Sequence, residues 1–149
     1  AMHSNGDSGR TEDVKIWGMW NILGEEVFGD ASQEELRPWY YTWSLMCRCF
    51  PAGCDILACG VPQHDGVRVA AARKDGAYSV AAVNFSQESC DIEIALPGDF
   101  AGGVLYRYTE NVRACDERGL PVPCERGIAG RSFRTTLPAE SFVLLTNIE

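Results

Sequence analysis

The chain has 149 residues, of which 46% are hydrophobic. That length supports one buried core and is too short for a barrel enzyme of roughly 250 residues. Acidic residues outnumber basic residues by 21 to 13, and the net charge of −8 argues against nucleic acid as a partner because it repels phosphate backbones. A neutral polysaccharide would not be repelled, although solubility alone explains an acidic balance. No run of about 18 apolar residues occurs, so no membrane-spanning helix is predicted.

The numbers and spacing of cysteines and histidines limit which disulfides and metal sites the chain can form. Seven cysteines are an odd number, which excludes a fully paired disulfide framework, although one bridge between Cys115 and Cys124 stays open. The four cysteines from 47 to 59 are spaced C-x-C-x4-C-x4-C, without the C-x2-C pairs of structural zinc sites. Two histidines are too few for a multi-histidine metal site. We therefore expect no metal and no cofactor, and free cysteines favour a reducing, cytoplasmic compartment.

The beginning of the chain carries little fold information. Residues 1–12 are polar and rich in Gly and Ser, without the apolar core of a signal peptide, and we expect a disordered or cloning-derived tail. Residues 13–53 follow as a first part of the fold and hold all four tryptophans. A short strand is predicted at Val14–Trp20, and glycines at positions 24 and 29 separate it from a helix.

The predicted helix begins with Ser32 as N-cap, because Glu35 three residues later completes a capping box. Pro38 agrees with this start, since proline is tolerated only near the first turn. An apolar stripe at helical spacing then follows, formed by Leu36, Trp39, Tyr40, Trp43, Met46 and Cys47. We expect this stripe to be core and Trp43 to be buried between the helix and a sheet.

Residues 54–149 are predicted to form a β-sandwich domain. The predicted strands are Cys54–Cys59, Val67–Lys74, Ala77–Phe85, Cys90–Leu96, Gly103–Thr109, Ser132–Leu137 and Phe142–Thr146. Asp75-Gly76 has the form of a two-residue type I′ hairpin turn. The polar segment 110–130 is predicted to be a long loop, and a short strand within it is left open. The fold class that follows is mainly β, an antiparallel β-sandwich of about seven to eight strands with one N-terminal α-helix.

Four segments, in this order, carry a family resemblance. Ile16–Trp20 resembles the eighth strand of a (β/α)8 barrel, and Pro38–Gly53 resembles the last helix of that barrel. Ala82–Ser86 and Leu137–Thr146 resemble strands of the small sandwich that follows the barrel in many glycoside hydrolases. The chain thus resembles the end of a glycoside hydrolase barrel together with its appended C-terminal β-sandwich.

The resemblance implies a non-catalytic accessory domain that supports a catalytic barrel, present in cis or in trans. Retaining barrel glycosidases carry their two catalytic carboxylates on the fourth and seventh strands, which a chain starting this late does not include, so no residue here inherits a catalytic role. The family also allows secretion. Asn84-Phe85-Ser86 is a formal glycosylation sequon, but an Asn at that place in the family's strand is structural, and we interpret Asn84 in the same way.

The aromatic residues Trp39, Tyr40, Tyr41 and Trp43 suggest a different function. Exposed indole and phenol rings stack on pyranose faces, so this cluster could serve as the platform of a carbohydrate-binding module. Core packing is the competing interpretation, and consecutive residues cannot all face one way on a helix. A third hypothesis is a small enzyme with an unrecognised site, which would need two carboxyl groups about 5 to 9.5 Å apart.

Overall fold

The computed structural model describes residues 19–20, 24–25, 29–60, 64–109 and 111–148. The chain divides into two compact units, Ala1–Trp43 and Ser44–Glu149. Most of the strand predicted at Val14–Trp20 lies outside the described residues, and within the described part Trp20 pairs with Leu36 in an isolated antiparallel bridge. No described helix is both long and apolar enough to cross a bilayer.

A short 3-10 helix, η3 (Ala31–Gln33), precedes the α-helix. Its N-cap is Asp30, whose Oδ1 accepts a hydrogen bond from the Ser32 backbone N–H at 2.9 Å. The predicted capping box at Ser32 is therefore wrong, because Ser32 lies inside η3 and the α-helix begins only at residue 38. The α-helix, α1 (Pro38–Cys49), begins on its proline. A missing N–H is harmless at this first helical position.

Helix α1 buries a different side from the predicted one. Tyr41, Leu45 and Cys49 are 6%, 0% and 0% exposed, and their spacing of four residues places them on one side of the helix. Trp43 is 56% exposed, so the expectation that it is buried is wrong. Both stripes of the helix are apolar, and the helical period alone does not distinguish which of them is buried.

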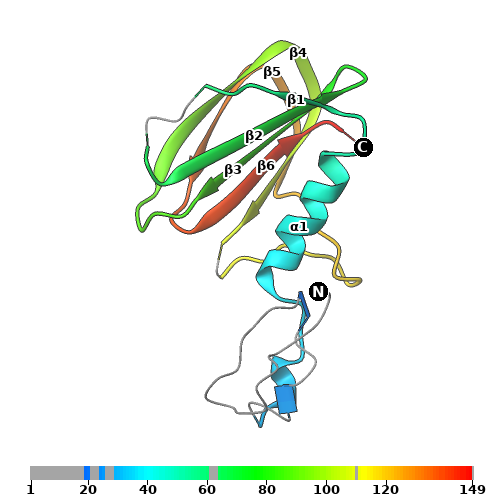
Figure 1. Cartoon of the computed structure of the whole chain (residues 1–149), viewed down its shortest axis with the longest axis vertical. Coiled ribbons are helices and arrows are strands. Elements are labelled where there is room, and N and C mark those ends of the chain that lie inside the picture. The colour runs from blue at the N-terminus through cyan, green and yellow to red at the C-terminus, as the bar shows by residue number, and fades with distance from the viewer. Residues whose placement is uncertain (1–18, 21–23, 26–28, 61–63, 110, 149) are drawn as a thin grey trace. The chain divides into compact units, whose positions relative to one another are not determined.

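In the described part of the second unit, six strands form one antiparallel sheet in the order β1-β2-β3-β6-β4-β5 (Figure 1). Their bounds are β1 (Asp55–Leu57), β2 (Val67–Lys74), β3 (Ala77–Asn84), β4 (Cys90–Tyr108), β5 (Glu125–Leu137) and β6 (Ser141–Thr146). The predicted fold class, mainly antiparallel β with one α-helix, is confirmed.

Strand β4 is long and bent, and it takes the place of two predicted strands. Its first half pairs with β5, from Cys90 opposite Leu137 to Ala95 opposite Ser132. Register shifts then follow up to Val104, where the glycines at 98 and 102 have φ of 79° and 69°. The last residues of β4 pair with β6, and Tyr108 lies opposite Phe142. Such irregularities bend a strand, and the sheet curls as a result (Figure 1).

The curled sheet encloses the hydrophobic core. The core cluster comprises Val67, Ala71, Val80, Ala82, Ile94, Leu96, Phe100, Leu105, Ile128, Leu137, Val143 and Leu145. On β6, Val143 and Leu145 belong to this cluster, whereas Leu144 points to the opposite face because side chains alternate along a strand. Leu144 is nevertheless 0% exposed. Strand β6 is thus buried on both faces, which explains its continuous apolar run.

Local turn chemistry explains the clearest hairpin. Strands β2 and β3 pair in register up to Lys74 opposite Ala77. The two residues between them, Asp75 and Gly76, have φ of 51° and 83°. A type I′ turn needs positive φ at both central positions, so the predicted hairpin is confirmed.

The segment 110–130 is only partly the loop that we predicted. Residues 125–130 belong to β5, where Gly127 and Gly130 have φ of 74° and 119° and interrupt the regular alternation. All seven cysteines are free thiols, including Cys115 and Cys124. Cys115 pairs with Pro121 across an isolated bridge, and the Cys124 thiol contacts the Leu105 carbonyl at 3.3 Å. The possible bridge between the two cysteines is therefore not formed.

Candidate functional site

The structure separates the four aromatic residues that we predicted as a sugar platform. Trp39 and Trp43 are 40% and 56% exposed, Tyr40 is half-buried, and Tyr41 is buried. The rings of Tyr40 and Tyr41 meet edge to face with centroids 5.4 Å apart, an arrangement typical of packed aromatic pairs. Of these four residues, Trp39 and Trp43 are the exposed ones.

Trp39 and Trp43 lie four residues apart on α1, so they stand on the same side of the helix, one above the other. Four residues correspond to a rise of roughly 6 Å. These two large apolar side chains form an exposed strip, here called the indole strip (Trp39 and Trp43). A strip of this kind fits either a protein surface or the apolar faces of sugar rings.

The last turns of α1 are fixed within the sheet unit. The Arg48 Nη2 donates a hydrogen bond to the Tyr106 hydroxyl at 2.5 Å, and the guanidinium carbon lies 5.5 Å from the centroid of that ring. Burial raises the pKa of the Cys49 thiol, an effect only partly offset by hydrogen bonding and charge from Arg48 and by hydrogen bonding with Thr146. Cys49 is therefore a buried neutral thiol rather than a reactive thiolate.

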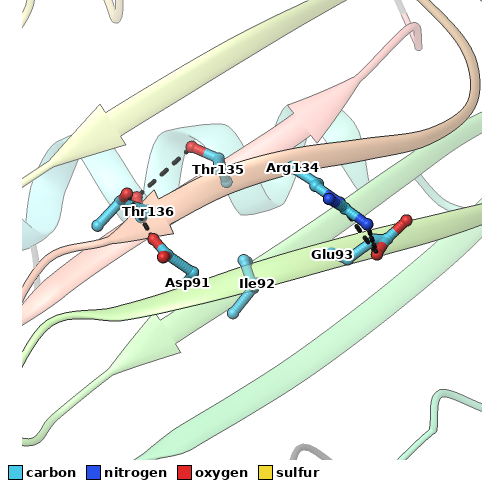
Figure 2. Close-up of a pocket in the computed structure, with 6 residues that line it drawn as sticks. All are labelled: Asp91, Ile92, Glu93, Arg134, Thr135 and Thr136. Atoms are coloured by element: carbon cyan, nitrogen blue, oxygen red, sulfur yellow. Dashed lines mark hydrogen bonds and ion pairs between the residues drawn. The ribbon is translucent and has the colours of Figure 1, made fainter.

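A second candidate site is an open groove of about 500 Å³ on β4 and β5, here called the β4–β5 groove (Figure 2). It is lined by Asp91, Ile92, Glu93, Arg134, Thr135 and Thr136. Asp91 lies opposite Thr136 and Glu93 opposite Arg134, so these residues are direct cross-strand neighbours. Figure 2 shows the two pairs at separate positions along the strands, with Ile92 between them.

Hydrogen bonds hold both pairs of the groove in place. The Thr136 hydroxyl donates to Asp91 Oδ1 at 2.7 Å, and the Arg134 Nε and Nη2 donate to Glu93 Oε2 at 3.2 and 3.1 Å. Hydrogen bonding and charge from Arg134 hold the pKa of Glu93 below its ordinary value. Glu93 is thus an ionised carboxylate. It does not fit the role of a general acid in glycoside hydrolysis, which needs a raised pKa.

Asn84 forms the most connected buried polar centre. Its Nδ2 donates to the carbonyls of Glu88 and Pro138 at 2.7 and 2.9 Å and lies 3.4 Å from that of Leu137. Its Oδ1 accepts from the backbone N–H and the hydroxyl of Ser86 at 3.0 and 2.7 Å. Asn84 is 2% exposed, so the prediction that this sequon residue is structural is confirmed.

The sequence predicted one of the two candidate sites and missed the other. The sequence drew attention to both tryptophans, but it did not indicate the β4–β5 groove. Its lining residues come from two segments that are about forty residues apart, and only the strand register brings them together. The available signal was the alternation of Asp91, Ile92 and Glu93, which placed the two acids on one exposed face. No group of three metal-ligating side chains occurs among the described residues.

Comparison with known proteins shows which solved structures share this fold. No protein-family model and no curated protein matches the sequence. Among solved structures, a family 30 glycoside hydrolase endoxylanase from Clostridium papyrosolvens C71 matches with a TM-score of 0.60 and 16% identity, over 79% of this chain and 29% of that one. A family 30 subfamily 8 xylanase from Clostridium acetobutylicum matches with a TM-score of 0.63 and 12% identity, over 87% and 30% of the two chains.

A third match is the catalytic domain of family 30 xylanase C from Talaromyces cellulolyticus, with a TM-score of 0.61 and 20% identity, over 87% of this chain and 27% of that one. At these identities the similarity shows the fold. The resemblance to a glycoside hydrolase domain, predicted from the sequence, is confirmed at that level. The chain spans less than a third of the length of each of these xylanases.

Proposed function

We propose that this chain is a non-catalytic accessory domain of a glycoside hydrolase and that its partner is a catalytic barrel, in cis or in trans. The observation that carries the proposal is the exposed indole strip on a helix whose sequence resembles the last helix of such a barrel. The fold supports it, because the matched xylanases are three to four times longer than the part that corresponds to this chain.

The exposed indole strip is energetically substantial. A fully exposed Trp has about 250 Å² of surface, so Trp39 and Trp43 together leave roughly 240 Å² in water at their exposures of 40% and 56%. At 25 cal/mol per Å², covering that surface is worth about 6 kcal/mol before the costs of association are subtracted. A partner that covers the strip therefore gains a strong anchor, because exposed tryptophans are frequent hot spots of interfaces.

Carbohydrate binding through the same strip is the second candidate function. The observation that favours it is the geometry of two exposed indoles on one side of one helix, which suits successive sugar rings. A glycan array and a titration of Trp fluorescence with neutral oligosaccharides separate the two functions. The accessory-domain proposal expects no saturable quench. A saturable quench that Trp43→Ala abolishes would replace it with the carbohydrate-binding proposal.

Loss of any exposed tryptophan could lower the binding of an apolar dye, so a tryptophan outside the indole strip serves as control. Trp20, which is 51% exposed and lies outside α1, supplies it. The double variant Trp39→Ala/Trp43→Ala should lose most of the binding of an apolar dye such as bis-ANS, whereas Trp20→Ala should retain most of it. Equal dye binding by the double variant and the wild type would contradict the proposal that the indole strip is the docking surface.

A further inference from the structure

Asn84 is the only asparagine of the chain that is followed two positions later by Ser or Thr, and Phe85 between them does not block recognition as a sequon. In the folded protein its side chain is 2% exposed. Both Nδ2 hydrogens are used, because Nδ2 donates to the carbonyls of Glu88 and Pro138 at 2.7 and 2.9 Å. A sugar on Nδ2 would remove one of these hydrogens and would have no room at a buried position. The folded state therefore excludes glycosylation of Asn84.

The order of synthesis leaves Asn84 accessible before it is buried. The carbonyls of Leu137 and Pro138, which face Nδ2, lie 53 and 54 residues further along the chain. Strand β6, in which Ser141 pairs with Asn84, is made later still. At about 5 to 20 residues per second, synthesis from Asn84 to Pro138 takes roughly 3 to 11 s. Throughout that time most of the groups that bury Asn84 do not yet exist.

The contacts of Asn84 within its own sequon are local, in contrast. Its Oδ1 accepts hydrogen bonds from the Ser86 backbone N–H and hydroxyl at 3.0 and 2.7 Å. A turn of this kind joins residues two positions apart and needs no distant segment, so the nascent chain can form it. It engages the amide oxygen, while Nδ2 lacks its acceptor at Pro138 until that residue has been made. The unfinished chain therefore presents the amide nitrogen that the finished fold hides.

We propose that Asn84 is a site of N-glycosylation in the unfolded chain and that glycosylation and folding exclude each other. The donor is a lipid-linked oligosaccharide diphosphate, bound to the oligosaccharyltransferase of a secretory compartment. Asn84 Nδ2 attacks the anomeric carbon and an N–C bond forms, while the C–O bond to the diphosphate breaks and its electron pair leaves with the diphosphate. One Nδ2 proton passes to a base of the transferase. A chain modified in this way can no longer place Asn84 between β3, Glu88 and the turn before β6.

Cell-free translation in the presence of endoplasmic reticulum membranes tests this proposal. The 149-residue chain is placed behind a cleavable secretion signal, and a reductant keeps its cysteines as free thiols. An acceptor tripeptide that occupies the transferase supplies unmodified chains from the same membranes. Without the tripeptide, we expect a glycan on Asn84 that endoglycosidase H removes. After detergent lysis, a protease should digest the glycosylated chains at least about tenfold faster than the unmodified ones.

The matched control is the double variant Ser86→Ala/Arg113→Ser, which moves the single sequon from Asn84 to Asn111, a residue that is exposed in the folded protein. Its glycosylated and unmodified forms should be digested at equal rates. Three results would overturn the proposal. They are an unmodified Asn84 in membranes that glycosylate Asn111 of the variant, equal digestion of modified and unmodified wild-type chains, and equally accelerated digestion of the glycosylated variant. None of them concerns dye binding at the indole strip, so the docking proposal is tested separately.

Discussion

Replacing Asn84 by alanine should be the most damaging single change of a polar residue in the sheet unit. The side chain joins the end of β3 to Glu88, just before β4, and to Pro138, in the turn before β6. Four of its hydrogen bonds are between 2.7 and 3.0 Å long. At about 1 kcal/mol net for each bond, Asn84→Ala should lower the free energy of unfolding by about 4 kcal/mol.

Urea unfolding followed by circular dichroism measures this change. With a denaturant slope near 2 kcal/mol/M, a loss of about 4 kcal/mol moves the midpoint down by about 2 M. Asn111→Ala is the control, because Asn111 is exposed, and its free energy of unfolding should change by less than about 0.5 kcal/mol.

Asn84→Asp distinguishes the donor role from simple packing. Aspartate keeps the shape of the side chain and still accepts from Ser86, but an ionised carboxylate cannot donate to the carbonyls of Glu88 and Pro138. We expect it to be at least as destabilising as alanine at pH 7. A loss below about 1 kcal/mol in Asn84→Ala, or wild-type stability in Asn84→Asp, would refute this reasoning.

Three further predictions concern other parts of the sheet unit. A Cβ at Gly103 would lie 2.0 Å from Cε1 of Phe100, so Gly103→Ala should lower the free energy of unfolding in urea by about 1 to 3 kcal/mol. Gly60→Ala is the control and should be nearly neutral, because a Cβ at Gly60 would have nothing within 4 Å. Equal effects of the two substitutions would contradict the steric argument. Because burial raises the pKa of Cys49, the folded state holds that proton more tightly than the unfolded state. Its contribution to stability is complete below the ordinary thiol pKa of about 8.5 and falls at higher pH. The free energy of unfolding should therefore fall more between pH 8 and pH 10 in the wild type than in Cys49→Ala. Equal falls in the two proteins would contradict this role of the Cys49 thiol. When the protein is secreted from yeast, the folded form should carry no glycan at the buried Asn84, whereas Arg113→Ser should create a usable sequon at the exposed Asn111. Mass spectrometry that finds a glycan on Asn84 of the folded protein would contradict this prediction.

Local signals in the sequence were enough for much of the fold. The positive φ that Asp75 and Gly76 adopt is a property of the turn itself, so the β2–β3 hairpin could be recognised from two residues. Ile94 and Leu96 alternate with exposed neighbours along β4, and both are buried as their period of two implies. These features depend on residues that are near one another in the chain.

Features that depend on distant partners were missed or misjudged. Helix α1 carries two apolar stripes, and the choice between the side of Trp43 and the side of Leu45 depends on what the rest of the chain places against it. The first half of β5 was interpreted as loop because Gly127 and Gly130 interrupt its alternation. The β4–β5 groove exists only after Glu93 and Arg134, 41 residues apart, are brought into register.

The central claim is that the indole strip is a docking surface for protein, and sedimentation equilibrium of the chain across a wide concentration range tests it most directly. The account predicts that the wild type self-associates through its uncovered strip and that Trp39→Ala/Trp43→Ala is monomeric at the same concentrations, with Trp20→Ala like the wild type. A wild type that stays monomeric throughout, or a double variant that associates equally well, would contradict the claim.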